Sequence, residues 1–166
     1  IVIVTVTDSG GNTDTQTITV TVTDVNEFTP VITSNSGGST ASISFAENST
    51  ATVTTVTSTD ADNLSGTTYS HSGTDAADFS INSSSGVLTF ASTPNYEIPA
   101  DADENNTYIV IVTATDNGSG SLTDTQTLTV TVTDVNEAPV ITSSSSTSFA
   151  ENSTSTVITV TSSDVD

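Results

Sequence analysis

The sequence of 166 residues contains no lysine and no arginine, while aspartate and glutamate together number 20, so the formal net charge is -20. A surface without cationic side chains cannot neutralise phosphates, which excludes nucleic acid as a partner. An anionic membrane surface would repel the chain for the same reason. Every carboxylate must therefore face water, accept a hydrogen bond from a neutral donor or lie against a bound cation.

Cysteine, methionine and tryptophan are also absent. Without cysteine the chain can form neither disulfides nor thiolate metal sites. No apolar run is long enough to cross a membrane, and no signal peptide is visible. Because even an initiator methionine is missing, we expect the sequence to be a piece of a longer polypeptide.

Threonine and serine are the abundant residue types, with 37 and 27 copies that together exceed a third of the chain. Valine and isoleucine alternate with threonine in several segments, a pattern typical of β-strands. Residues 17–23 and 127–133 alternate strictly, so their aliphatic side chains should face a core and their threonines water. Residues 108–114 carry apolar side chains on both faces and are expected to form a central strand.

Two further segments carry local signals. Residues 79–81 and 87–90 flank Asn82-Ser-Ser-Ser-Gly86, which is typical of a hairpin turn. Residues 52–57 lose their alternation at Val53 and Val56, which indicates a bulge or a kink. About seven short strands within about 110 residues predict an all-β fold of tandem Greek-key β-sandwiches, immunoglobulin-like in type.

The sequence also repeats itself. Residues 24–27, Asp-Val-Asn-Glu, return at 134–137, and residues 45–50 return at 149–154. Loops of different length account for the unequal spacing of the matches. We therefore expect the C-terminal part of one repeat at 1–27, a complete repeat at 28–137 and the N-terminal part of the next repeat at 138–166. Since half a sandwich cannot bury a core, further repeats or neighbouring copies should complete the two partial ones.

Acidic and amide residues recur at the repeat junctions and at strand ends. Calcium takes six to eight oxygen ligands from such side chains, and carboxylates that converge without any lysine or arginine need a cation to offset their repulsion. The spacing and recurrence therefore predict calcium ligands. The ligands predicted in this way lie in the two linkers and in two Asp-x-Asp pairs: Asp24, Asn26, Glu27, Asp60, Asp62, Asp134, Asn136, Glu137, Asp164 and Asp166. Glu47, Glu97 and Asp116 are further carboxylates at strand ends and turns.

The ordered set of motifs resembles the tandem repeats of cadherins, in the bacterial cadherin-like surface or adhesin style. The resemblance covers the whole chain, although any single motif would be weak evidence. The motifs that carry it are Phe45-Ala-Glu-Asn48, Asp60-Ala-Asp62, the hairpin of residues 79–89, Asn95-Tyr-Glu97, Thr113-Ala-Thr-Asp116 and Asp134-Val-Asn-Glu137-Ala-Pro139.

The resemblance implies that calcium lies between consecutive repeats. For the second junction it implies Glu47, Glu97, Asp134, Asn136, Glu137, Asp164 and Asp166 as ligands. For the first junction it implies Asp24, Asn26, Glu27, Asp60, Asp62 and Asp116. Asn95 stands where the family usually has aspartate, so fewer ions or weaker binding could follow.

Asp101, Asp103 and Glu104 lie in an additional loop after Glu97. They could form a further cation site, but a solvated acidic loop is the simpler interpretation.

The predicted function is that of a calcium-rigidified segment of an extracellular or cell-surface protein, acting as an adhesive or structural spacer or as a filament component. Its expected partners are the adjacent repeats of the same chain, with homophilic contacts and filament self-assembly as open alternatives. A carbohydrate-binding module of a secreted bacterial protein is the second hypothesis, which the absence of tryptophan disfavours. An enzyme is not expected, because the acids recur in each repeat instead of forming one active site.

Overall fold

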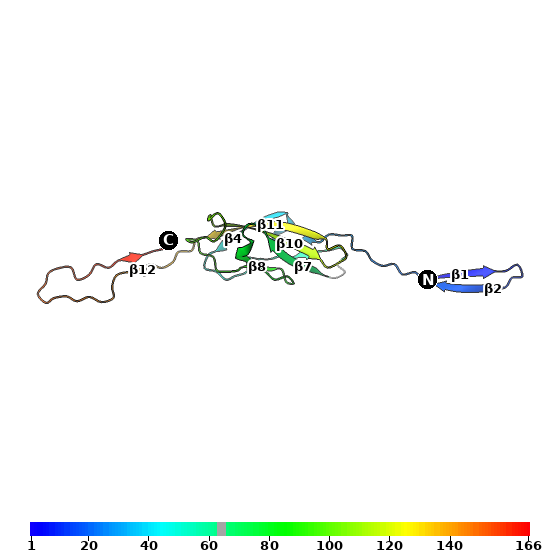
Figure 1. Cartoon of the computed structure of the whole chain (residues 1–166), viewed down its shortest axis with the longest axis horizontal. Coiled ribbons are helices and arrows are strands. Elements are labelled where there is room, and N and C mark those ends of the chain that lie inside the picture. The colour runs from blue at the N-terminus through cyan, green and yellow to red at the C-terminus, as the bar shows by residue number, and fades with distance from the viewer. Residues whose placement is uncertain (63–65) are drawn as a thin grey trace.

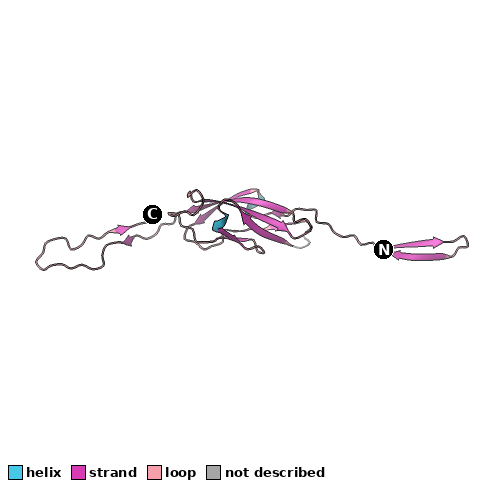
Figure 2. Cartoon of the chain, in the orientation of Figure 1, coloured by secondary structure: helices cyan, strands magenta, loops and turns pink. Residues whose placement is uncertain are grey.

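The computed structural model describes residues 1–62 and 66–166, and strands make up nearly all of its regular structure (Figure 2). The strands are β1 (Val2–Thr7), β2 (Thr13–Ile18), β3 (Val31–Ile32), β4 (Thr40–Ala46), β5 (Thr54–Thr55), β6 (Ser58–Thr59), β7 (Thr67–Ser72), β8 (Phe79–Ile81), β9 (Val87–Phe90), β10 (Thr107–Asp116), β11 (Thr123–Thr133), β12 (Val140–Ile141) and β13 (Ser162–Ser163). Two short 3-10 helices, η1 (Asn35–Gly37) and η2 (Ala76–Asp78), complete the described elements. Neither could reach across a bilayer.

The strands from β3 to β11 form a sandwich in the middle of an elongated molecule (Figure 1). One sheet has the order β4-β11-β10-β7, in which β4 runs parallel to β11 and the other pairs are antiparallel. The sheets β5-β9-β8 and β3-β6 supply the remaining strands. This arrangement confirms the predicted all-β sandwich.

β10 is one of the two inner strands of the larger sheet, as predicted for residues 108–114. It lies between β11 and β7 and alternates strictly in burial. Tyr108, Val110 and Val112 are buried, whereas Ile109 and Ile111 on the other face are only half-buried. The face of β10 that carries Ile109 and Ile111 therefore lies on the outer surface of the sheet and does not form a second core.

The segment predicted to be kinked is divided between two partners. β5 pairs with β9, whereas β6, three residues further on, pairs with β3. Val53 and Val56, which break the alternation, are both buried in the core. The interruption thus lets one length of chain pair with two neighbours while it keeps both valines inside.

The predicted hairpin turn joins β8 and β9. The side-chain oxygen of Asn82 accepts hydrogen bonds from the N–H groups of Ser84 and Ser85, at 3.0 and 2.9 Å. Gly86 closes the turn with a φ of 70°, and its N–H donates to the Asn82 carbonyl at 2.9 Å. A Cβ at Gly86 would lie 2.1 Å from the carbonyl oxygen of Val56, so the turn needs glycine for both its conformation and its close packing.

The N-terminal part corrects one strand prediction. β2 ends at Ile18, and residues 19–23 are not strand, although residues 129–133, with the same sequence, lie in β11. Val22 is 92% exposed, whereas Val132 at the matching position is 1% exposed. The physical reason is that β11 pairs with β10 and β4 and faces a second sheet, whereas β2 pairs with β1 alone within the described residues. Alternation marks a strand only where partners are present to cover it.

The C-terminal part, from residue 138, holds only the short pair of β12 with β13. Its large apolar side chains, including Val140, Ile141 and Phe149, are exposed. This part and the β1–β2 hairpin lie at opposite ends of the sandwich (Figure 1).

We expect Gly86→Ala to lower the free energy of unfolding of the sandwich by about 2–4 kcal/mol, because the methyl group adds a backbone clash to the cost of a positive φ. Urea unfolding measures the loss. Gly120→Ala is the matched control, since Gly120 has a φ of 100° with open space around it and should lose only about 1 kcal/mol. Equal losses in the two variants would show that the contact with Val56 has no role.

Candidate metal-binding junctions

One end of the sandwich gathers four carboxylates. Glu47, Glu97, Asp134 and Glu137 each place one carboxylate oxygen within 4.8 Å of the others. The parallel pairing of β4 with β11 explains part of this convergence, because Glu47 follows β4 and Asp134 follows β11 at the same end of the sheet. The N–H of Glu47 donates to the Thr133 carbonyl at 3.1 Å and keeps the two strand ends together.

Glu47 is the anchor of this group and is only 2% exposed. One carboxylate oxygen accepts the N–H of Tyr96 at 2.8 Å, and the other accepts the N–H of Val135 at 2.9 Å. The side chain therefore joins the end of β4 to the segment that carries Glu97 and to the linker after β11. Backbone donors hold the buried charge where no cationic side chain exists.

Glu137 connects the linker to the C-terminal part of the chain. Its N–H donates to the carboxylate of Asp166 at 2.9 Å, and one of its own carboxylate oxygens accepts a hydrogen bond from Asn48. Removal from water, contact with Asp166 and the nearby charges of Glu47 and Glu97 raise the pKa of the Glu137 carboxyl. These carboxylates therefore repel one another in the absence of a cation.

Two oxygens of the group have no hydrogen-bond donor. Oε2 of Glu97 and Oε2 of Glu137 are buried, and neither contacts a donor among the described residues. An unpartnered buried carboxylate oxygen is costly, and a bound cation removes that cost. The donor set consists of oxygen alone, which fits calcium or another hard divalent ion.

The opposite end of the sandwich holds a second group. The side-chain N–H of Asn26 donates to Asp116 at 2.9 Å and to the Ser119 carbonyl at 3.1 Å. Asp62 accepts the N–H groups of Glu27 and Phe28 at 2.8 and 3.0 Å. These contacts fasten the linker after the β1–β2 hairpin to the sandwich, at the end opposite to Glu47.

The pKa values of Asp60 and Asp62, both in this second group, shift in opposite directions. Contact with the Asp62 carboxyl raises the pKa of Asp60, whereas the N–H of Phe28 is the main cause that lowers the pKa of Asp62. Oδ1 of Asp62 is buried and has no donor among the residues that the structure describes. As at the other end, a carboxylate pair and an unpartnered oxygen lie together without a positive charge.

Several predicted ligands stay outside the two groups. Asp24 and Glu27 have exposed side chains that form no hydrogen bond with the described residues. Among the described residues, Asp164 accepts only the N–H of Val165, at 3.1 Å, and Asn136 donates to the carbonyl of Glu137 at 2.7 Å. The structure therefore brings together the residues nearest the sandwich and leaves the outer parts of both linkers open.

Sequence reasoning did not select Asn48 as a site residue. It has a φ of 56°, donates through its backbone N–H to the Pro94 carbonyl at 2.9 Å and contacts Glu137 through its side chain. The signal was available, because Asn48 recurs with the same motif as Asn152, which has a φ of 59°. Asparagine adopts this backbone conformation more readily than most residues.

The acidic loop after Glu97 is solvated only in part. Asp103 and Glu104 are exposed, as the simpler interpretation predicted, but Asp101 is 3% exposed. Its carboxylate accepts the N–H groups of Asn105 and Asn106 at 2.8 and 3.2 Å. Asp101 therefore organises its own loop through backbone hydrogen bonds.

We expect Glu47→Gln to reduce the free energy of unfolding by about 1–3 kcal/mol in the presence of a chelator, because the new amide group would face a backbone N–H. Chemical denaturation at neutral pH measures this effect. Glu151→Gln is the matched control, since Glu151 occupies the same motif in an exposed position and should change little. A loss as large in the control would mean that the hydrogen bonds of Glu47 are not the cause.

Comparisons with known proteins agree with this architecture. The structure is similar to the protocadherin GammaB4 extracellular domain, with a TM-score of 0.59 and 24% identity over 93% of this chain and 26% of that one. It is also similar to human CDH23 EC21-23, with a TM-score of 0.62 and 23% identity over 98% of this chain and 52% of that one. Drosophila N-cadherin EC1-4 gives a TM-score of 0.52 and 27% identity over 69% of this chain and 27% of that one.

The chain thus spans between about a quarter and a half of the length of these structures. The search of curated proteins found no match. The family model of the cadherin domain matches residues 41–133, which is more than half of the chain and runs from the second residue of β4 to the end of β11. The chain belongs to the cadherin domain family.

Proposed function

We propose that this chain is a segment of a tandem cadherin array whose junctions are stiffened by calcium. The observation that carries the proposal is the convergence of Glu47, Glu97, Asp134 and Glu137, in which Oε2 of Glu97 and Oε2 of Glu137 are buried and lack a donor among the described residues. The chain has no lysine or arginine that could neutralise them. A calcium ion would supply the missing positive charge and would bind oxygens from both sides of the junction.

The ligand sets divide by junction. At the second junction, Asn136, Asp164 and Asp166 join the four grouped carboxylates. Asp166 supports this assignment because it already contacts the N–H of Glu137. At the first junction, Asp24, Asn26 and Glu27 come from the linker, and Asp60, Asp62 and Asp116 come from the sandwich. Asp24, Glu27 and Asp164 lie outside the two groups in this structure, and their movement onto a bound ion would complete the two ligand sets.

The proposal of tandem repeats is supported by two strands that match in sequence but differ in burial. Val2 and Val4 of β1 are 52% and 48% exposed, whereas Val110 and Val112 at the matching positions of β10 are fully buried. The same apolar strand face is buried in the core at β10 and exposed at β1. The exposed face of β1 therefore needs the remaining strands of a repeat to cover it. We therefore assign residues 1–27, 28–137 and 138–166 to three consecutive repeats.

The array would act outside the cell as an adhesive or structural spacer. A related structure is named as an extracellular domain, and calcium is abundant enough outside cells to fill sites of moderate affinity. Repeats joined by calcium form a rod, because the ions fix the angle between neighbouring domains. This role requires no catalysis. Homophilic contact, filament assembly and carbohydrate binding stay predictions of the sequence.

We expect calcium to lengthen and stiffen the chain in solution. Small-angle scattering should show a larger and better-defined maximum dimension with calcium than with a chelator, and the melting temperature should rise with calcium concentration. Unchanged dimensions together with an unchanged melting temperature would contradict the proposal.

Glu97→Gln should weaken calcium binding about tenfold or more, since it removes one charge from the group that lacks donors. Isothermal titration calorimetry measures the affinity. Glu104→Gln removes the same charge from an exposed site in the same sandwich and should leave the affinity nearly unchanged. A similar loss in both variants would indicate that calcium responds only to the overall negative charge.

A further inference from the structure

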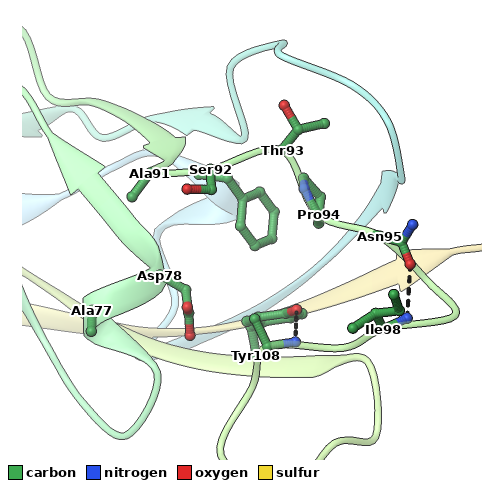
Figure 3. A pocket seen from close by; sticks show the side chains of 11 residues that line it. Ala77, Asp78, Ala91, Ser92, Thr93, Pro94, Asn95, Ile98 and Tyr108 are labelled. Carbon is green, nitrogen blue, oxygen red and sulfur yellow. Dashed lines mark hydrogen bonds between the residues drawn. The ribbon is translucent and has the colours of Figure 1, made fainter.

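A hollow of about 290 Å³ opens on the side of the sandwich and contains none of the predicted calcium ligands. The rings of Phe90 and Tyr108 meet at its wall, with their centroids 5.1 Å apart and their planes at 87°. Figure 3 shows Asp78 on one side of the hollow and Pro94 and Ile98 on the other. Asp78 is the only residue in this lining that carries a charge.

The backbone holds Asp78 firmly in this position. Its N–H donates to the Asp75 carbonyl at 3.0 Å, and its carbonyl accepts the N–H of Ala91 at 2.8 Å. The side chain is different, because no group in residues 1–62 and 66–166 donates a hydrogen bond to its carboxylate. Desolvation, followed by the charges of Asp75 and Asp101, raises the pKa of Asp78.

The neighbouring acids do not share this lack of donors. Asp75 accepts the N–H groups of Ala102 and Ile109 at 2.9 and 2.6 Å, and Asp101 accepts N–H groups from its own loop. Their charges still add to the negative potential at Asp78. A concave apolar surface concentrates such a field, so the hollow favours a positive group with an apolar stem.

We propose that this hollow binds the side chain of an arginine or lysine from a partner protein. The alkyl stem would lie against Phe90, Pro94 and Ile98, and the charged group would donate hydrogen bonds to the Asp78 carboxylate. A charge-assisted hydrogen bond of this kind is stronger than a neutral one, and the nearby aromatic rings add to the attraction of the cation.

The composition of the chain decides which partner can supply that side chain. These 166 residues contain no lysine or arginine, so neither this segment nor a second copy of it supplies the side chain, which comes from a partner outside the segment. Calcium fits poorly, because it needs six to eight oxygens and this hollow presents one carboxylate among mainly apolar groups. The volume is near the lower limit of small-ligand pockets and suits a single long side chain.

The test is a titration of the full chain, at saturating calcium, with three blocked tripeptides that carry arginine, lysine or neutral citrulline between two glycines. Amide signals are followed by NMR. We expect saturable shifts at Ala77, Asp78, Thr93 and Ile98 with the arginine or lysine peptide, with dissociation constants on the order of 1 mM. Equal shifts with the citrulline peptide, or no localised shifts with any peptide, would overturn the proposal.

Three variants separate the hollow from general charge. Asp78→Asn should weaken peptide binding about tenfold or more, and Ala77→Phe, a change at an exposed rim residue, should abolish it by filling the space. Asp14→Asn removes the same charge from the distant β1–β2 hairpin and should leave binding unchanged. If Asp14→Asn weakens binding as much as Asp78→Asn, the attraction is not specific to the hollow.

A calcium titration without peptide completes the test. We expect it to leave the signals around Asp78 unmoved while those of the junction residues shift. Calcium-induced shifts at Asp78 that compete with the peptide would make the hollow a metal site and would overturn the proposal. Melting temperatures of the variants verify that each is folded, and Asp78→Asn with its matched control decides the outcome even if Ala77→Phe does not fold.

Discussion

The whole structure depends on how negative charge is accommodated in a chain that has no lysine or arginine. Backbone N–H groups are the main donors available to its buried carboxylates. Glu47, Asp75 and Asp101 each accept two of them, and Asp124 accepts the N–H of Ile32 at 2.8 Å and so ties β11 to β3. Each acid consequently fastens a loop or strand end to the sandwich. At the two junctions and at Asp78, carboxylate oxygens lack a donor among the described residues, and a cation from outside the segment would balance their charge.

Much of the fold follows from periodicity and turn chemistry, which are local properties of the sequence. The hairpin at Gly86, the inner strand β10 and the interruption near Val56 were predictable because each leaves a mark within a few residues. The strand prediction failed at residues 19–23 because a strand there depends on distant partners and not on a local signal. The same alternation forms β11 in one place and no strand in the other, because pairing and burial are supplied by distant parts of a repeat and not by the segment itself.

The candidate sites were predictable to a similar extent. Recurrence identified Glu47, Asp134 and Glu137, whereas Glu97, whose motif occurs once, came from the resemblance to cadherin repeats. The structure shows why they converge, since parallel pairing brings two of their segments to one end. The recurrence of its motif at Asn152 marks Asn48, but the sequence could not reveal its partner, because the contact with Glu137 joins residues 89 positions apart. Nor could it separate buried Asp101 from exposed Asp103, because the difference depends on which carboxylate finds backbone donors. The hollow beside Asp78 depends on the packing of Phe90 and Tyr108, which lie in different sheets.

The parallel pairing of β4 with β11 also determines how the sandwich carries load. The chain enters the sandwich near one end and leaves it at the other, so tension draws β4 and β11 in opposite directions along their common axis. Seven residue pairs, from Thr40 with Thr127 to Ala46 with Thr133, are then strained together in shear instead of opening one after another. A spacer built of such units would transmit force from one repeat to the next through these seven pairs acting together.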